Sequence, residues 1–236
     1  MPNLIEISDI HHQVHKRLSI DIDQLFFQDG PIYGLIGEAG SGKTTLLRIL
    51  ALLQPVEKGK ITVFETPADA KKHPKQLRRR LGYLPQQPTM FSGTVADNIA
   101  MGLHFRRKDE EEIEARVKNL LAEFHCSDLG RVPANQLSRG QQQIVALLRT
   151  LAPYPEVLLM DEPSTHLDKD QYDLFLNYIK MLNNDRGVTI ILSTKSKDIV
   201  RRVVNISISM RYGKIVRIRT GEHQLKDENG SGPRIS

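Results

Sequence analysis

A glycine-rich stretch near residue 40 carries the clearest chemistry in the chain. Residues 37–45 read GEAGSGKTT and match the pattern G-x-x-x-x-G-K-[ST]. Glycines let a backbone wrap closely around a phosphate chain, and N–H groups at a helix start point at anionic oxygens. In this interpretation Lys43 reaches the β- and γ-phosphates of a nucleotide, and the Thr44 hydroxyl ligates Mg²⁺. The alternative is a glycine turn with an incidental lysine. The residues predicted to hold the nucleotide here are Gly37, Glu38, Ala39, Gly40, Ser41, Gly42, Lys43, Thr44 and Thr45.

Two acidic residues follow an apolar run later in the chain. Residues 157–160 read VLLM, and Asp161 and Glu162 come directly after them. A buried strand would place both acids at its carboxyl end, where open α/β sheets bind ligands. Asp161 is then positioned to hold Mg²⁺, and Glu162 to polarise the attacking water as a general base. Acids that merely cap the following loop are the alternative interpretation.

The elements that must position these residues are read from hydrophobic periodicity. Strands are expected at 4–7, 18–23, 32–36, 61–64, 81–84, 157–160, 188–192, 206–210 and 215–218, and helices at 43–53, 94–103, 109–125, 138–152, 169–183 and 196–203. This alternation predicts an α/β sheet with helices on both faces, and the helix-only block from about 87 to 155 looks like an insertion that splits the core. Together with the glycine-rich motif of residues 37–45 and its likeness to a P-loop, the fold class that we expect is a P-loop NTPase core with a mainly parallel sheet, N-terminal antiparallel strands and an inserted helical subdomain. Within a single domain over 1–236, residues 1–86 and 156–220 are assigned to the core, 87–155 to the helical subdomain and 221–236 to a flexible tail.

Composition excludes several classes of protein. The chain has 236 residues, one cysteine and a net charge of +5. A single cysteine rules out a disulfide framework and a multi-cysteine metal site. No apolar stretch approaches the roughly 18–20 residues that a membrane-spanning helix needs, and the first residues do not resemble a signal peptide. We therefore expect a cytoplasmic chain, in which the basic clusters 78–80 and 106–108 are solvated helix faces.

Three further motifs give the chain a family resemblance. Residues 137–141, LSRGQ, resemble the signature of ATP-binding cassette (ABC) ATPases. Residues 83–86, YLPQ, look like the family's Q-loop, and residues 164–168, STHLD, look like its D-loop. The similarity runs from about residue 4 to residue 218, which is nearly the whole chain.

The resemblance implies a mechanism in which two cassettes pair head to tail and sandwich two ATP molecules. The signature residues Ser138, Arg139, Gly140 and Gln141 would then face the partner's ATP, with Ser138 and the Gly140 amide on the γ-phosphate. It also implies that Gln86 senses Mg²⁺ and the attacking water, and that Asp168 lies at the dimer seam. Without the resemblance, Ser138 is a helix cap and Gln86 a surface residue.

The chain departs from the family pattern at three places. Arg139 stands where the signature usually has glycine, and Lys195 stands where a switch histidine usually follows Thr194. We expect Lys195 to bind the γ-phosphate without being essential for the chemistry. Residues 1–25 contain no Phe, Tyr or Trp to stack on adenine, so His12 is assigned that role, with a surface position in a hairpin as the alternative.

The resemblance further implies a transporter with separate membrane permease subunits, placing the chain peripherally on the inner face of the cell membrane. Met90 and Phe91, which follow Gln86, either pack against a permease helix or lie within the helical subdomain's own core. Residues 88–103 look like those of importers of oxyanions such as tungstate or phosphate, and also like a class linked to metal export. The alternatives are a soluble ABC-type ATPase acting on nucleic acid or ribosomes, or a nucleotide-binding regulator. No direct nucleic-acid contact is expected, and the dimer partner is either a second copy or another cassette.

Overall fold

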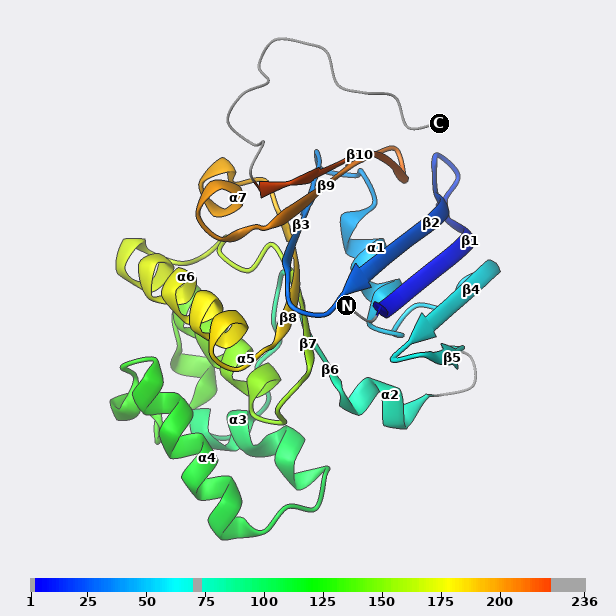
Figure 1. The fold of residues 1–236 in the computed structure, drawn as a ribbon. Coiled ribbons are helices and arrows are strands. Elements are labelled where there is room, and N and C mark those ends of the chain that lie inside the picture. Colours follow the sequence, from blue (N-terminus) through cyan, green and yellow to red (C-terminus); the bar gives the residue numbers. More distant parts are fainter. Residues whose placement is uncertain (1–2, 70–73, 222–236) are drawn as a thin grey trace.

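A computed structural model describes residues 3–69 and 74–221, and it contains two β-sheets with a block of helices to one side (Figure 1). The first sheet is antiparallel and has the strand order β2-β1-β4-β5. Ile7 on β1 lies opposite Leu25 on β2 and opposite Ile61 on β4. These strands are β1 (Asn3–His15), β2 (Leu18–Gln28), β4 (Lys58–Val63) and β5 (Thr66–Ala68).

The second sheet has the strand order β10-β9-β3-β8-β7-β6, and every pair in it is parallel except β9 with β10. Parallel strands bring their carboxyl ends to one edge, so Ile36 pairs with Thr194 and Asp161 with Ser193. The functional residues that follow these strands are therefore collected at this carboxyl edge. The strands are β3 (Ile32–Ile36), β6 (Leu81–Leu84), β7 (Val157–Asp161), β8 (Thr189–Thr194), β9 (Ile206–Arg211) and β10 (Lys214–Thr220).

Strand β7 is buried on both faces because the second sheet lies between two apolar layers. Val157 and Leu159 join a core cluster with the first sheet and helix α1 (Lys43–Leu50). Leu158 and Met160 join the other cluster, which contains the remaining long helices. Those helices are α3 (Val95–His104), α4 (Glu110–Glu123), α5 (Arg139–Leu151), α6 (Lys169–Asn184) and α7 (Lys197–Val203).

Helices α3 and α4 form the green block at the bottom of Figure 1, and α5 connects it to the larger sheet through contacts with α3 and β6. The Thr94 side chain caps α3 by accepting from the Asp97 N–H, and the Asp97 carboxylate accepts from the Thr94 N–H, which fixes the start of the helix. Short 3₁₀ turns at Ser127–Leu129 and Ala134–Gln136 lead from α4 to α5. The described residues contain no helix long and apolar enough to span a bilayer.

The architecture matches the predicted fold class, and several boundaries differ. The predicted helix 43–53 ends at Leu50, because Leu52 has a left-handed backbone (φ 57°) and Leu53 turns outward, 49% exposed. Strands β1 and β2 extend well beyond the predicted 4–7 and 18–23, since hydrogen bonding across the hairpin continues through less regular residues. Strand β5 and helix α2 (Lys75–Arg79) were not predicted from the sequence. The subdomain boundaries stay a prediction, and the expected tail beyond Gly221 lies outside the described residues.

Candidate nucleotide site

The loop from β3 to α1 folds tightly around the Lys43 side chain. Gly40 and Gly42 have positive φ angles of 76° and 103°, and a Cβ on Gly42 would lie 2.5 Å from the Ile20 side chain. Glycine is therefore required at position 42 for both backbone and packing reasons. The Lys43 ammonium donates to the Gly37 carbonyl at 2.6 Å and to the Glu38 carbonyl at 3.0 Å.

The carboxyl end of β7 meets this loop. The Thr44 hydroxyl donates to Asp161 Oδ2 at 2.7 Å, and the Ser193 hydroxyl at the end of β8 donates to Asp161 Oδ1 at 2.6 Å. The structure thus brings two of the three residues predicted for Mg²⁺, Thr44 and Asp161, into direct contact, and the third, Gln86, lines the same cavity. Asp161 is only 2% exposed, and a buried carboxylate needs hydrogen-bond partners. The half-buried Thr44 hydroxyl and the buried Ser193 hydroxyl supply one partner for each carboxylate oxygen.

Glu162 lies beside this pair with one oxygen held and one free. Its Oε2 accepts from the Lys195 backbone N–H at 3.3 Å. Its Oε1 is buried and has no hydrogen-bond partner in the described structure. A buried carboxylate oxygen without a partner is costly, and such groups mark positions that a water or ligand completes.

These groups surround a cavity of about 200 Å³. It is lined by Leu18, Ala39, Gly40, Ser41, Gly42, Lys43, Thr44, Thr45, Gln86, Asp161, Glu162 and Lys195. The cavity therefore gathers most of the predicted nucleotide residues with Gln86 and with both acids. Gly37 and Glu38 contribute backbone carbonyls that hold Lys43 and do not line it.

Burial is the main influence on the pKa of the Lys43 ammonium in this cavity. It lowers the pKa of Lys43, which is 6% exposed; the carboxylates of Glu162 and Asp161 oppose this, whereas Lys195 lowers the pKa further. A phosphate chain in the cavity would favour the protonated lysine, because an opposite charge offsets the cost of desolvation.

The donor set fits Mg²⁺ held together with a nucleotide. A threonine hydroxyl and an aspartate carboxylate are oxygen ligands of the kind that Mg²⁺ prefers, and Mg²⁺ commonly keeps waters and substrate phosphates as its other ligands. The described residues hold no group of three or more His, Cys, Asp or Glu side chains placed for a metal.

The signature residues start α5 at some distance from this cavity and do not line it. Ser138 is exposed and caps the helix, accepting from the Gln141 N–H at 3.2 Å while Gln141 Oε1 accepts from the Ser138 N–H. Arg139 is exposed, and Gly140 is packed so closely on Gln171 and the His166 backbone that a Cβ would clash. At the start of α5, Ser138 and Arg139 are thus exposed, whereas Gly140 is buried.

Asp168 and His12 also lie outside the cavity lining. Asp168 is exposed and caps α6 by accepting from the Gln171 N–H at 2.9 Å. His12 is 9% exposed, with Nε2 at 3.2 Å from Gln54 Nε2 and Nδ1 at 3.8 Å from Glu57. The alternative of a surface histidine at position 12 is therefore wrong, and its adenine role stays a prediction.

Two residues of the site were not singled out by the sequence. Leu18 lines the cavity from the first position of β2, and Ser193 bonds Asp161 from β8. Leu18 belongs to a period-two apolar pattern, which predicts a residue of the hydrophobic core. A signal for Ser193 did exist, because a polar residue that ends a buried strand needs a hydrogen-bond partner.

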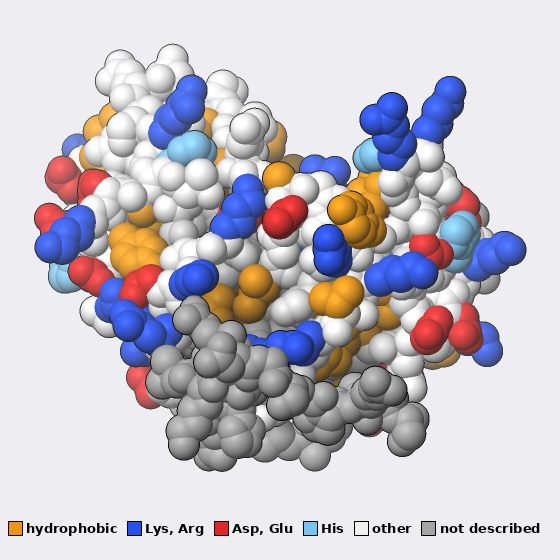
Figure 2. Space-filling model, turned by 90° about the horizontal axis from the view of Figure 1, so that it is seen from above, with side chains coloured by type: hydrophobic (Ala, Val, Ile, Leu, Met, Phe, Trp, Pro, Cys, Tyr) orange, Lys and Arg blue, Asp and Glu red, His pale blue; other side chains and the backbone are white. Residues whose placement is uncertain are grey.

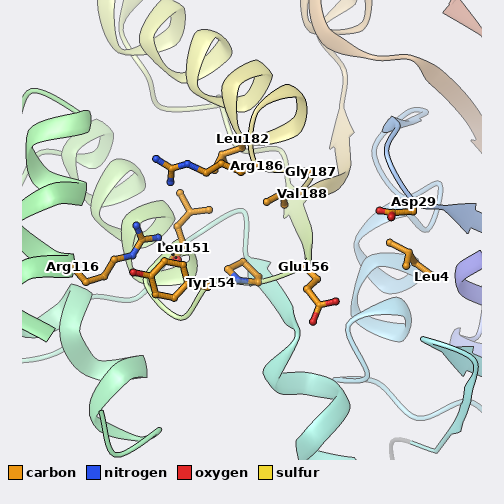
Figure 3. Close-up of a pocket in the computed structure, with 11 residues that line it drawn as sticks. Leu4, Asp29, Arg116, Leu151, Tyr154, Glu156, Leu182, Arg186, Gly187 and Val188 are labelled. Carbon is orange, nitrogen blue, oxygen red and sulfur yellow. Dashed lines mark hydrogen bonds between the residues drawn. The ribbon is translucent and has the colours of Figure 1, made fainter. Parts of the chain in front are cut away.

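A second, larger cavity of about 330 Å³ lies at the opposite, amino edge of the sheet (Figure 3). Asp29, Glu156 and Val188, which precede β3, β7 and β8, contribute to it. Arg116, Tyr154 and Arg186 form its other wall.

Comparison with known proteins agrees with this geometry. A family model described as "ABC transporter" matches residues 21–165. The methionine import ATP-binding protein MetN of Legionella pneumophila is 33% identical over 216 residues, covering 90% of this chain and 63% of MetN. The sulfate/thiosulfate import ATP-binding protein CysA of Synechococcus elongatus is 34% identical, covering 91% of this chain and 62% of CysA. The chain thus spans less than two thirds of these relatives' length.

Solved structures share the fold. CbiO1 of Clostridium perfringens, part of the ABC transporter complex cbiONQ, superposes with a TM-score of 0.82 and 25% identity over 94% of this chain and 90% of that one. A dimeric ATP-binding cassette in a post-hydrolysis state with ADP and Pi gives a TM-score of 0.82 and 24% identity over 92% of this chain and 98% of that one. These likenesses confirm the predicted fold class. Because the family model covers more than half of its residues, the chain belongs to the ABC transporter family.

Proposed function

We propose that the chain is the ATP-binding and ATP-hydrolysing subunit of an ABC transporter and drives a solute through separate permease subunits. The observation that carries this proposal is the unpartnered Oε1 of Glu162 in the cavity that also holds Lys43, Thr44 and Asp161. A general base, a phosphate-binding cation and a metal-ligand pair within one cavity are the parts that ATP hydrolysis needs.

Each residue has a chemical task in this proposal. Lys43 and the backbone N–H groups of residues 39–45 bind the phosphate chain, and Thr44 and Asp161 hold Mg²⁺, which neutralises charge on the phosphate oxygens. Glu162 takes a proton from water as the water oxygen bonds to the γ-phosphorus. The bond from that phosphorus to the β–γ bridging oxygen breaks, leaving ADP and phosphate. Gln86 and the Lys195 side chain bind at the γ-phosphate end of the cavity.

For the complete site we propose an ATP sandwich between two cassettes. The support is the exposure of Ser138 and Arg139 at the start of α5, because a helix N-terminus attracts anionic oxygens. In the pair, Ser138, Arg139, Gly140 and Gln141 of one cassette lie against the γ-phosphate bound by the other. Asp168 then lies at the seam.

Permease docking beside Gln86 is the proposed link to the membrane, and it places the chain peripherally on the inner face. Phe91 is 45% exposed under the Arg149 guanidinium, whereas Met90 packs against the helical core cluster. Of the two alternatives from the sequence, permease contact therefore suits Phe91, and packing within the helical subdomain suits Met90. In Figure 2, basic side chains on the face shown are interspersed with acidic and polar ones, which favours a protein partner over nucleic acid.

For the solute, the proposal is uptake of a small molecule or ion. Oxyanions such as tungstate or phosphate are the finer proposal from residues 88–103. CysA is named for sulfate and thiosulfate, and MetN for methionine, so those solutes are the competing set. ATP turnover of the chain bound to its permease, with each solute supplied in turn, distinguishes them.

The test of the sandwich is Glu162→Gln, which keeps the shape of the side chain and removes the base. We expect this variant to bind Mg²⁺-ATP, to lose turnover by about 10²–10⁴-fold, and to form an ATP-dependent dimer. Light scattering after gel filtration measures the dimer. The matched control is Glu156→Gln at the other end of β7, where the carboxylate pairs with Arg80. A Glu162→Gln protein that stays monomeric with ATP at high concentration would contradict the sandwich.

A further inference from the structure

We infer that Ser193 is a positioning residue that fixes both the metal-side and the base-side carboxylates of the nucleotide site. This inference rests on the proposed function, and it gives a role to a residue that has none in that proposal. Ser193 is the residue before the last in the buried strand β8, lies opposite Asp161 in the sheet register, and is 0% exposed.

The Ser193 hydroxyl makes one hydrogen bond to each acidic residue. It donates to Asp161 Oδ1 at 2.6 Å and accepts from the Glu162 backbone N–H at 2.9 Å. A hydroxyl has one donor and two acceptor positions, so one oxygen serves both residues at once. The geometry makes Ser193 the link between the side of the site that holds Mg²⁺ and the side that holds the base.

The link extends to both walls of the cavity. On one side, Asp161 Oδ2 accepts from the Thr44 hydroxyl at the start of α1. On the other side, Glu162 Oε2 accepts from the Lys195 N–H. Thr44, Asp161, Ser193, Glu162 and Lys195 therefore form one continuous chain of bonded residues, in which Ser193 is the central member.

The backbone of Glu162 explains why this anchor matters. Its φ of 45° lies in the left-handed region, which a glutamate adopts only when its surroundings hold it there. The Thr165 hydroxyl donates to the Glu162 carbonyl at 2.9 Å, and Ser193 accepts from its amide. With the peptide held on both sides, the side chain is fixed with Oε1 unpartnered.

Position 195 contributes to this arrangement through its backbone. The N–H that reaches Glu162 is present in any residue except proline, so the lysine at 195 leaves the anchoring of the base intact. The side chain at position 193 is different, because only a hydroxyl of this size both donates to Asp161 and accepts from Glu162 there.

Strand β8 also supplies a matched control. Thr189, at its other end, is 0% exposed, and its hydroxyl likewise donates to a carboxylate, Asp29, at 3.1 Å and accepts from a backbone N–H, that of Gly30, at 3.0 Å. It lies at the edge away from the nucleotide cavity. Thr189→Val therefore removes the same kind of buried hydroxyl without touching the proposed machinery.

The experiment compares Ser193→Ala with Thr189→Val in the full chain, with the permease present if turnover requires it. Three quantities are measured: kcat and KM for ATP, the Mg²⁺ concentration at half-maximal turnover, and the Kd for ATP by calorimetry with and without Mg²⁺. Thermal unfolding records the stability that each variant loses.

We expect Ser193→Ala to lower kcat by about 10- to 100-fold with KM changed less than about threefold, since a small misplacement of a catalytic group costs this much. Half-maximal turnover shifts to higher Mg²⁺, and Mg²⁺ tightens ATP binding less than in the unmodified protein. Thr189→Val loses similar stability and keeps all three kinetic and binding quantities.

The inference is overturned if Ser193→Ala matches Thr189→Val in kcat and in the effect of Mg²⁺ on ATP affinity. A chain that binds ATP without hydrolysing it would instead refute the proposed function. In that case the Mg²⁺ effect on ATP affinity alone decides about Ser193: a loss confined to Ser193→Ala supports the inference, and an unchanged effect overturns it.

Discussion

The cavities at the two edges of the six-stranded sheet differ in how their charged groups are paired. At the amino edge, in the larger cavity of Figure 3, Arg186 pairs with Glu123 at 2.8 Å, and Glu156 pairs with Arg80. At the carboxyl edge, in the smaller cavity, Glu162 Oε1 has no hydrogen-bond partner among the described residues. The larger cavity is thus the one whose carboxylates are satisfied.

Arg116 shows the same contrast with Lys43. Both cations are buried, and both donate to backbone carbonyls. Arg116 donates to the carbonyls of Leu151 and Ala152, at the carboxyl end of α5, and lies 4.0 Å from the Tyr154 ring centroid. This is a complete structural role, since cations stabilise helix carboxyl ends. Lys43 instead holds the glycine loop together through the Gly37 and Glu38 carbonyls, beside two carboxylates. Buried polar atoms of His12, Tyr83 and Gln143 also lack partners among the described residues, so an unpartnered atom alone does not mark a functional site. The distinguishing feature of the carboxyl-edge cavity is an unpartnered carboxylate oxygen beside a buried lysine and a second carboxylate.

The largest expected effect is a loss of ATP binding when the carboxyl-edge cavity is changed at Lys43. Lys43→Ala is predicted to weaken ATP binding at least about 100-fold, because charge-assisted hydrogen bonds to phosphate contribute about 1.5–3 kcal/mol each. Calorimetry with Mg²⁺-ATP measures it, with the exposed Lys180→Ala on α6 as control. Unchanged affinity in a folded Lys43→Ala protein would remove the main support for the carboxyl-edge site.

The next effect concerns stability at the amino edge. Arg116→Met is expected to lower the free energy of unfolding by about 1–3 kcal/mol, because the α5 carbonyls lose their donor and Tyr154 loses its stacked cation. Urea denaturation measures it against the exposed Arg107→Met. ATP affinity should stay unchanged. A loss of ATP binding as large as that of Lys43→Ala would show that the amino-edge cavity is not purely structural.

Features made by neighbouring residues could be predicted from the sequence, whereas features made by residues that only the fold brings together could not. Residues 37–45, and Asp161 and Glu162 at the end of β7, are neighbours in the sequence, so their chemistry could be predicted from the sequence. Ser193 and Leu18 join the site only through strand pairing, which periodicity does not reveal. The early end of α1 depends on a left-handed Leu52, for which leucine carries no sequence signal. Burial of His12 likewise results from packing against Gln54.

A smaller effect is expected at the open rim of the carboxyl-edge cavity. The Lys195 side chain is exposed, and its contact with Glu162 is made by the backbone N–H, which Lys195→Ala retains. We predict a fall in turnover of less than about tenfold, the cost of one exposed charge contact to phosphate. Steady-state ATPase assays beside Glu162→Gln measure it. If Lys195→Ala is as inactive as Glu162→Gln, the lysine is essential after all.

The smallest expected effect is a pH dependence in the paired residues near the amino-edge cavity. Burial alone would raise the pKa of Glu123, but hydrogen bonds from Tyr178 at 2.6 Å and Arg186 at 2.8 Å outweigh it and leave the pKa lowered. Folding therefore favours the ionised carboxylate, so its stabilisation is present above the unfolded-state pKa and is lost as the pH falls through the lower folded-state pKa.

Glu123→Gln should remove this contribution, which is under about 1 kcal/mol for a carboxylate that is partly exposed. Urea denaturation between neutral pH and pH values below the ordinary glutamate pKa of 4.5 measures it, with the exposed Glu114→Gln on the same helix as control. The Glu123→Gln protein is expected to lose stability at neutral pH and to show a shallower decline in acid. Equal slopes for both variants would mean that the Glu123 pairing adds nothing, and the contrast between the two cavities would then rest on Arg116 and on the Glu156–Arg80 pair.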